Sequence, residues 1–226
     1  MAELASLPGV TVAATNVTTA PLRTLADVIP VPSEGARRVA REIALVGGFA
    51  VLTAVFAQIK FSLGFTPVPI SGQTFAVLLA GTALGWQRGM ASQALYWVAG
   101  IFMPVVWYAD DTTGASISAG WHAATGTTAG YLAGFVLAAA VVGYLAERGQ
   151  DRDFATSIPA MLAGTAAIYT CGVLWLAYDL NLPVTSGEQN AISLGLTPFL
   201  VGDLLKLTAA GLLTPLAWRA VQRSRT

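Results

Sequence analysis

The sequence predicts an all-α integral membrane protein in which six transmembrane helices form one bundle. Of its 226 residues, 55% are hydrophobic and 11% are charged, whereas a soluble domain carries about 25% charged residues. The mean hydropathy is +0.64. Long apolar segments recur along the chain, and its arginines cluster in alternate connections between them. These observations together place the chain in a lipid bilayer.

The apolar segments define the six predicted helices. About 20 apolar residues are needed to cross a bilayer. The segments cover residues 43–65, 74–86, 89–108, 130–146, 159–180 and 197–218. The second segment is too short to span alone. We expect the preceding stretch, 66-TPVPISGQ-73, to supply non-helical backbone at membrane depth, because its two prolines disfavour a continuous helix.

The arginines predict the orientation of the chain. They lie before the first segment, between the second and third, between the fourth and fifth, and after the sixth. These are Arg37, Arg38, Arg41, Arg88, Arg148, Arg152, Arg219, Arg223 and Arg225. The opposite connections contain no Lys or Arg except Lys60, near the end of the first segment. Basic residues favour the inner side, so we expect a multi-pass protein of the cell membrane with both termini in the cytoplasm.

The chain is expected to contain a tail and one membrane domain. Residues 1–36 are rich in Pro, Thr and Ser and contain no apolar run long enough to span. We interpret them as a flexible cytoplasmic tail, followed by a six-helix membrane domain over residues 37–226. No Lys or Arg precedes Arg23, which argues against a cleaved signal peptide.

Several functions are disfavoured by composition. Twelve Lys plus Arg balance twelve Asp plus Glu, so nothing in the net charge indicates a nucleic-acid partner. A single cysteine, Cys171, and a single histidine, His122, argue against a zinc or haem site. The sequence has no GxxxxGK[ST] phosphate-binding loop. We therefore expect no metal, no cofactor and no ATP hydrolysis by this chain.

An acid and a base interrupt the sixth segment at 202-GDLLK-206. A charge at mid-membrane costs about 2.5–3.5 kcal/mol on insertion scales. Asp203 and Lys206 are three residues apart and so share one helix face. They form either an internal ion pair or a polar ligand site in the outer half of the bilayer. A carboxylate accepts N–H donors while an ammonium donates, which suits a small molecule bearing both kinds of group.

Two further clusters contain candidate ligand-binding residues. The stretch 126-GTTAGYLAGF-135 offers the hydroxyls of Thr128 and Tyr131, and its glycines Gly130 and Gly134 mark either helix packing or close approach to a ligand. Gln73 is a polar residue at the start of the second helix and is equally ambiguous.

Two other features also allow two interpretations each. The long connection 105–128 contains Trp107, Tyr108 and Trp121, which form either an interfacial aromatic belt or a lid with stacking surfaces. In the first helix, Ala50 and Ala54 are separated by four residues, as are Ala40 and Ala44. Small residues at this spacing let another helix pack closely, either within this protein or from a partner.

Four stretches in this order resemble the BioY family of biotin-specific S components of energy-coupling factor (ECF) transporters. They are 67-PVPISGQTFAVLLAGTALG-85, 96-YWVAGIFMPV-105, 126-GTTAGYLAGF-135 and 198-PFLVGDLLK-206. The resemblance covers roughly residues 44–218. It implies six helices, an outward-facing biotin pocket, and a small-residue stripe on the first helix that docks to a transmembrane coupling (T) subunit. Two ATPase subunits would supply the energy.

The resemblance also implies roles for single residues. Asp203 and Lys206 would bind the ureido ring of biotin, and Tyr131, Thr128 and Gly130 would lie in the same pocket with Gln73. The chain departs from the family in having Thr127 in place of a proline and Leu132 where some members carry an arginine for the valerate carboxylate. The stretch 107-WYADDTTGASISAGWH-122 is longer and more acidic than its family counterpart, which makes Trp107 and Asp110 looser candidates.

Two alternatives remain open from the sequence. One keeps the architecture but binds a different vitamin. The other is an intramembrane hydrolase built on Ser116, Ser118 and His122, although 114-GASISAGWH-122 is not a GxSxG nucleophile elbow.

Overall fold

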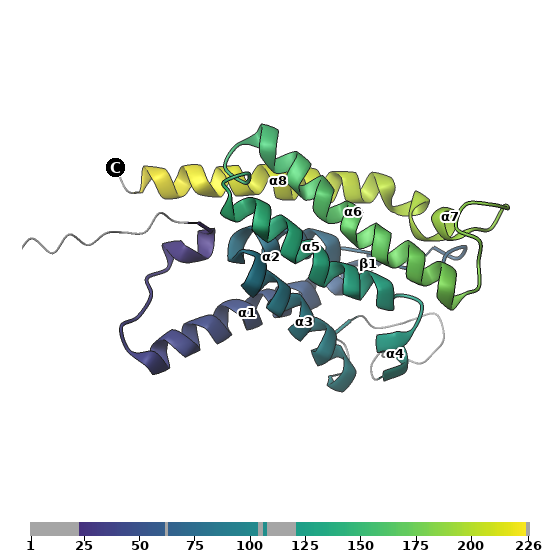
Figure 1. The fold of residues 1–226 in the computed structure, drawn as a ribbon, viewed down its shortest axis with the longest axis horizontal. Coiled ribbons are helices and arrows are strands. Elements are labelled where there is room, and N and C mark those ends of the chain that lie inside the picture. The colour runs from purple at the N-terminus through teal and green to yellow at the C-terminus, as the bar shows by residue number, and fades with distance from the viewer. Residues whose placement is uncertain (1–22, 62, 104–105, 108–120, 225–226) are drawn as a thin grey trace, which may run out of the picture.

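The computed structural model describes residues 23–61, 63–103, 106–107 and 121–224, which form a bundle of helices (Figure 1). The long helices are α1 (Gly35–Ala57), α2 (Gln73–Leu84), α3 (Trp86–Phe102), α5 (Ala129–Glu147), α6 (Phe154–Asp179) and α8 (Leu200–Arg223). The short elements are η1 (Leu25–Val28), β1 (Lys60–Phe61), β2 (Ile70–Ser71), α4 (Trp121–Thr125), α7 (Ala191–Gly195) and η2 (Thr197–Phe199). The described part of the chain is therefore mostly helical, as the sequence predicts.

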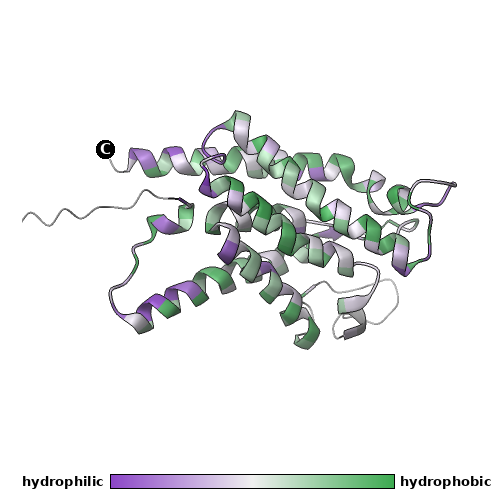
Figure 2. Cartoon of the chain, in the orientation of Figure 1, coloured by the Kyte–Doolittle hydropathy of each residue, from purple (hydrophilic) through white to green (hydrophobic). Residues whose placement is uncertain are grey.

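Four helical stretches in the described part are long and apolar enough to cross a membrane. They are Gly35–Ala57, Ala129–Glu147, Phe154–Asp179 and Ala191–Arg223. Helices α2 and α3 are shorter, with 12 and 17 residues. The non-helical backbone expected before α2 is present, because β1 and β2 pair antiparallel, with Lys60 opposite Ser71. Figure 2 shows apolar residues along most of the bundle and hydrophilic residues concentrated towards its ends.

The first helix differs from its predicted range. It spans Gly35–Ala57 rather than residues 43–65, so Arg37, Arg38 and Arg41 lie inside the helix and not before it. At its start, Arg37 forms an i, i+3 ion pair with Glu34, 3.2 Å between Nε and Oε2. A search for apolar residues alone misses such a charged first turn. At its end, pairing of β1 with β2 directs the chain away from a helical path.

Helix α5 lies in the middle of the bundle and packs against α6, α3 and α2. Glycines allow this close packing. A Cβ at Gly143 would lie 2.4 Å from the backbone nitrogen of Trp86, and one at Gly134 would lie 2.8 Å from the Cα of Ile168. Contacts this short exclude any side chain larger than hydrogen. The backbone of α5 is therefore held from two sides, and its first turn has a fixed place in the fold.

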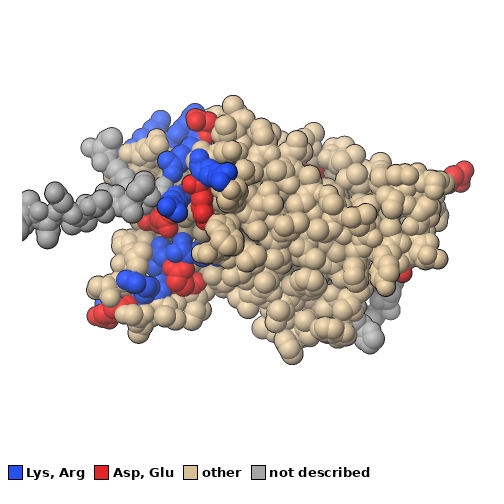
Figure 3. All heavy atoms as spheres, viewed as in Figure 1, with Lys and Arg blue, Asp and Glu red and all other residues tan. Residues whose placement is uncertain are grey.

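Charged residues gather at one end of the molecule (Figure 3). Helices α1, α3 and α6 begin at this end, and α2, α5 and α8 end there. Eight of the nine arginines of the alternate connections occupy these helix ends and turns, and the ninth, Arg225, lies outside the described residues. The structure thus brings together the basic residues that the sequence separates into four groups.

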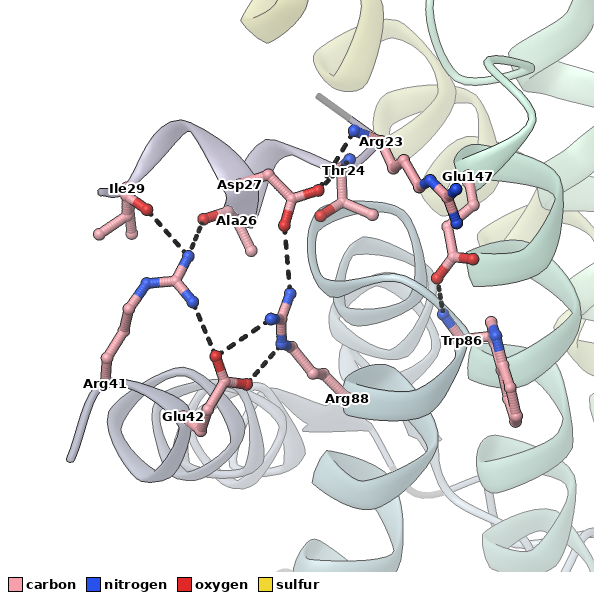
Figure 4. Close-up of polar contacts among 10 residues, drawn as sticks. All are labelled: Arg23, Thr24, Ala26, Asp27, Ile29, Arg41, Glu42, Trp86, Arg88 and Glu147. Atoms are coloured by element: carbon pink, nitrogen blue, oxygen red, sulfur yellow. Dashed lines mark hydrogen bonds and ion pairs between the residues drawn. The ribbon is translucent and has the colours of Figure 1, made fainter. Parts of the chain in front are cut away.

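Residues 23–29, here called the N-terminal strap, pack against this charged end (Figure 4). Nη2 of Arg41 donates to the carbonyls of Ala26 and Ile29, at 2.5 and 2.9 Å. Arg88 bonds to Glu42 through Nε, at 2.5 Å, and to Asp27 through Nη1, at 3.3 Å. The strap belongs to the stretch 1–36 predicted as a flexible tail, and Arg41 of α1 binds two of its backbone carbonyls. Residues 1–22 lie outside the described residues.

Replacement of Arg88 tests the strap. In Arg88→Met, Asp27 and Glu42 lose their shared cation, and we expect the free energy of unfolding to fall by about 1 kcal/mol because these groups are partly exposed. Hydrogen exchange of the strap amides in detergent should become faster. Arg37→Met is the control, because its pair with Glu34 is far more exposed. Unchanged exchange in Arg88→Met would contradict this role.

The turn between α5 and α6 contains a buried carboxylate. Asp151 is 1% exposed, and its Oδ2 accepts a 2.6 Å hydrogen bond from the indole N–H of Trp218 in α8. Its Oδ1 has no partner among the described residues. Burial raises the pKa of Asp151 from its ordinary value of 3.8 to about 6, although the Trp218 hydrogen bond opposes this shift. Asp151 therefore connects the α5–α6 turn to the end of α8. The free energy needed to bury its carboxylate depends on pH, because the ionised form is the one that burial disfavours.

Because its folded-state pKa is raised, Asp151 favours the folded state at low pH and loses that contribution as the pH rises through about 6. Asp151→Asn should remove this dependence. We expect the stability of the wild type to fall by about 2–3 kcal/mol more than that of the variant between about pH 4 and pH 7. Thermal unfolding in detergent across this range measures the difference. Asp153→Asn, a change at an exposed neighbouring carboxylate, should behave like the wild type.

Candidate functional site

A cavity of about 160 Å³ lies between α2, α5, α6 and α8. The segment before α2 and Trp107 complete its wall. Asp203 lies in the first turn of α8, and Gln73 and Tyr131 lie in the first turns of α2 and α5. Helices α2, α5 and α8 all end at the charged end, so their first turns place the cavity towards the opposite end of the bundle.

Asp203 is the most heavily hydrogen-bonded polar residue of this cavity. Its side chain is 6% exposed, and that of Lys206 is 20% exposed. Oδ1 accepts from Nζ of Lys206 at 2.6 Å and from Oγ1 of Thr74 at 3.1 Å. Oδ2 accepts from the hydroxyl of Tyr169 at 2.5 Å. The predicted shared helix face of Asp203 and Lys206 is confirmed. The two side chains form the ion pair that was one of the two interpretations, and the pair is also joined to α2 and α6.

Tyr169 and Thr74 were not identified as site residues from the sequence. Tyr169 lies inside the apolar segment 159–180, well away from both ends, where a tyrosine is unusual because these residues favour the membrane interfaces. The position of this tyrosine in the middle of an apolar segment was the feature of the sequence that could have marked it as a site residue. Nothing in the sequence alone connects Tyr169 with Asp203, since the two residues lie on different helices and are 34 positions apart.

The start of α5 forms another wall of the cavity. Tyr131, Thr127 and Thr128 all line it. The hydroxyl of Tyr131 donates to the carbonyl of Gly195 at 2.7 Å, and its ring lies edge-on to that of Tyr169 with centroids 6.3 Å apart. The carbonyl of Gly126, which precedes the helix, accepts from the indole N–H of Trp175 at 2.9 Å. The turn that leads into α5 is therefore fixed beside the cavity.

Gly130 does not line the cavity, contrary to the prediction. A Cβ at this position would lie 2.2 Å from Cβ of Trp175 and 2.6 Å from the carbonyl oxygen of Cys171. Gly130 therefore allows α5 to pack against α6, as Gly134 does one turn later. Of the two interpretations of this glycine pair, helix packing is correct.

Gln73 and Trp107 both line the cavity. The amide of Gln73 donates to the hydroxyl of Tyr96 at 2.5 Å and accepts from Oγ of Ser71 at 2.6 Å. Trp107 is 3% exposed, so this residue is a buried wall of the cavity rather than part of an interfacial belt. Asp110 lies outside the described residues, as do Ser116 and Ser118 of the hydrolase alternative.

The predicted docking residues of α1 face inwards. Ala50 belongs to the hydrophobic core, and the partly buried Ala54 packs against that core. The exposed small residues of α1 include Ala40, Ala44 and Gly48, also spaced by four. A four-residue spacing defines a stripe on a helix, but packing against α3 and α2 decides which stripe faces outwards.

This arrangement suits the binding of a small molecule. Among the described residues, no group of three or more His, Cys, Asp or Glu could hold a metal ion. The cavity combines apolar walls, including Phe135 and Ile168, with a few hydrogen-bonding groups near Asp203. Such a cavity orients a small ligand by a few polar contacts and buries the rest of its surface.

Removal of the Tyr169 hydroxyl should weaken the fold through Asp203. In Tyr169→Phe, Oδ2 of Asp203 loses its donor while remaining buried, and a hydrogen bond to a charged group contributes about 1.5–3 kcal/mol. We expect a decrease of that size in the free energy of unfolding, measured by thermal denaturation in detergent. Tyr178→Phe is the matched control on the same helix, because Tyr178 is 79% exposed. Equal stability of the two variants would contradict this role of Tyr169.

Comparison with known proteins agrees with the fold. The sequence profile described as "BioY family" matches residues 23–223. The biotin transporter BioY of Thermotoga maritima is 35% identical over 174 residues, covering 76% of this chain and 93% of that protein. The probable biotin transporter BioY of Pyrococcus horikoshii is 37% identical over 172 residues, covering 76% and 92%. These relatives are named as transporters, not enzymes.

A solved structure supports the fold independently. The crystal structure of the S component for biotin from an ECF-type ABC transporter matches with a TM-score of 0.66 at 20% identity, covering 83% of this chain and 95% of that one. At this identity the match concerns the fold alone. The family profile covers nearly all the described residues, and two relatives exceed 30% identity over most of their length. The chain therefore belongs to the BioY family.

Proposed function

We propose that the chain binds biotin from outside the cell and acts as the substrate-specific S component of an ECF-type transporter. The observation that carries the proposal is the buried Asp203–Lys206 pair in a cavity of the membrane bundle. Relatives that match over most of their length are named biotin transporters, and no covalent chemistry is required of the chain.

The chemistry of biotin complements this pair. Its ureido group offers two N–H donors and one carbonyl acceptor. The carboxylate of Asp203 accepts N–H donors and the ammonium of Lys206 donates to a carbonyl. The bicyclic ring and the aliphatic chain are apolar, as are the cavity walls formed by Phe135, Ile168 and Phe199. The Asp203–Lys206 pair thus corresponds to the polar ureido group of biotin, and the apolar walls correspond to its ring and aliphatic chain.

The proposed topology has six membrane-crossing helices with both termini in the cytoplasm. Helices α2 and α3 are short, but α2 is extended towards the opposite side by the non-helical segment before it. Charged residues at one end support a cytoplasmic placement of that end. The cavity, bounded by helix starts at the other end, would then open to the outside.

The partners would be a transmembrane coupling subunit and two ATPase subunits, since this chain has no phosphate-binding loop. Outward-facing Ala40, Ala44 and Gly48 replace Ala50 and Ala54 as the candidate contact with the coupling subunit. Around them, Val39, Ile43 and Val51 are between 58% and 67% exposed. This face of α1 would otherwise contact lipid.

Biotin binding to two variants tests the site. Asp203→Asn and Lys206→Met each remove one charged hydrogen-bonding partner, and we expect the affinity for biotin to fall by about 10–100-fold in each. Isothermal titration with purified protein in detergent measures this change. Asp179→Asn, at the end of α6 and away from the cavity, is the control and should bind as the wild type does.

Wild-type affinity in both site variants would refute the assignment of Asp203 and Lys206. Competition separates biotin from another vitamin: an excess of unlabelled thiamine or riboflavin should leave labelled biotin bound. Displacement by either would favour the alternative that the chain is an S component for a different vitamin.

A further inference from the structure

A basic patch lies where the end of α8 meets the start of α6. It consists of Arg152, in the α5–α6 turn, and of Arg219 and Arg223, near the end of α8, and all three side chains are exposed. Figure 3 shows Lys and Arg side chains gathered over this part of the charged end. Asp153, next to Arg152, is also exposed. The patch, here called the α6–α8 patch, therefore presents three guanidinium groups beside one exposed carboxylate.

Aromatic rings hold two of these arginines in place. Cζ of Arg219 lies 4.6 Å from the ring centroid of Phe154, the first residue of α6. Cζ of Arg152 lies 4.6 Å from the ring centroid of Trp218, which is itself 3% exposed. A guanidinium stacked on a ring keeps its N–H groups at its edge, in the planar fork that fits the oxygens of a phosphate. Both groups are thus positioned before any anion binds.

The arginines at the starts of α1 and α3 are in a different electrostatic environment. Arg41 pairs with Glu42, and Arg88 pairs with both Glu42 and Asp27. In contrast, no carboxylate of the described residues lies within ion-pair distance of Arg219. Positive potential at the α6–α8 patch is therefore available to an anion that comes from outside the chain.

Apolar side chains continue the patch along α8. Leu212 and Leu216 are 43% and 50% exposed. With Arg219 and Arg223 they follow a spacing of four, three and four residues, which places all four on one face of the helix. A rise of about 1.5 Å per residue puts Leu212 roughly 10 Å from Arg219 along the helix. This face of α8 therefore has a cationic end and an apolar stem, which complement an amphiphile with an anionic head.

We propose that the α6–α8 patch binds the phosphate headgroup of an anionic phospholipid, whose acyl chains lie against Leu212 and Leu216. Arginine binds phosphate oxygens through two parallel hydrogen bonds. Basic residues near a membrane surface each increase the affinity for anionic lipid by about fivefold. The site lies in the cytoplasmic leaflet of the proposed topology. It uses none of the residues of the biotin cavity, so the two proposals can fail separately.

The test measures lipid binding by native mass spectrometry of the purified full chain in detergent. Phosphatidylglycerol and phosphatidylcholine with identical acyl chains are added at equal concentrations. The wild type should bind phosphatidylglycerol at least about 10-fold more tightly, because its net negative charge is not offset by a choline group. A double variant with Arg152→Gln and Arg219→Gln should lose most of this preference.

Two further variants separate the patch from overall charge. Phe154→Leu keeps every charge but removes the ring that positions Arg219, so the preference should fall by about 2–5-fold. It also decides the question if the double variant does not fold. A second double variant, with Arg37→Gln and Arg38→Gln, is the matched control. It removes two exposed arginines from the same end of the molecule, on α1, and should keep the wild-type preference.

Three outcomes would refute the lipid site. One is equal binding of the two lipids by the wild type, and another is an unchanged preference in the folded Arg152 and Arg219 variants. The third is an equal loss in the α1 control, which would assign the effect to the net charge of that end. Displacement of phosphatidylglycerol by millimolar glycerol phosphate, which has no acyl chains, would indicate a site for soluble phosphate and also contradict the proposal.

Discussion

The fold around the cavity depends on neutralising one carboxylate inside an apolar bundle. Removal of one partner from a buried ion pair typically costs about 3–5 kcal/mol, because the remaining charge is left without compensation. Asp203 avoids this cost through Lys206 on its own helix, Tyr169 on α6 and Thr74 on α2. The same contacts hold three helices at fixed positions around the cavity. The contacts that stabilise the buried charge of Asp203 therefore also fix the positions of the side chains that line the cavity.

The sequence was sufficient for features that depend on local spacing. Apolar runs predicted the long helices, and the three-residue offset of Asp203 and Lys206 predicted a shared face. It was insufficient where contacts between helices decide the outcome. Spacing alone did not show that Ala50 faces the core, that Gly130 packs on α6, or that Tyr169 reaches Asp203. The charged start of α1 was missed because hydrophobicity marks the middle of a membrane helix better than its ends.

The two ends of the bundle differ in the kind of interaction that stabilises them. At the charged end, Arg88 contacts Asp27 of the N-terminal strap and Glu42 of α1 through partly exposed ion pairs of small energy, and the buried guanidinium of Arg41 donates to two carbonyls of the strap. At the other end, a few buried hydrogen bonds surround Asp203, and each is strong because water is excluded. Loss of one Arg88 contact should therefore weaken the charged end only slightly, whereas loss of one hydrogen bond to Asp203 leaves a buried charge less compensated.

The charge balance of the cavity also has a consequence for the empty protein. A free arginine in this cavity would be a buried, uncompensated charge whenever no ligand is bound, at a cost of several kcal/mol. Lys206 escapes the problem because Asp203 pairs with it in the empty cavity. A transporter alternates between loaded and empty states in every transport cycle. It is stable in both states only if the charges in its cavity are balanced without the ligand. In the described part of this cavity, Lys206 and Asp203 balance each other.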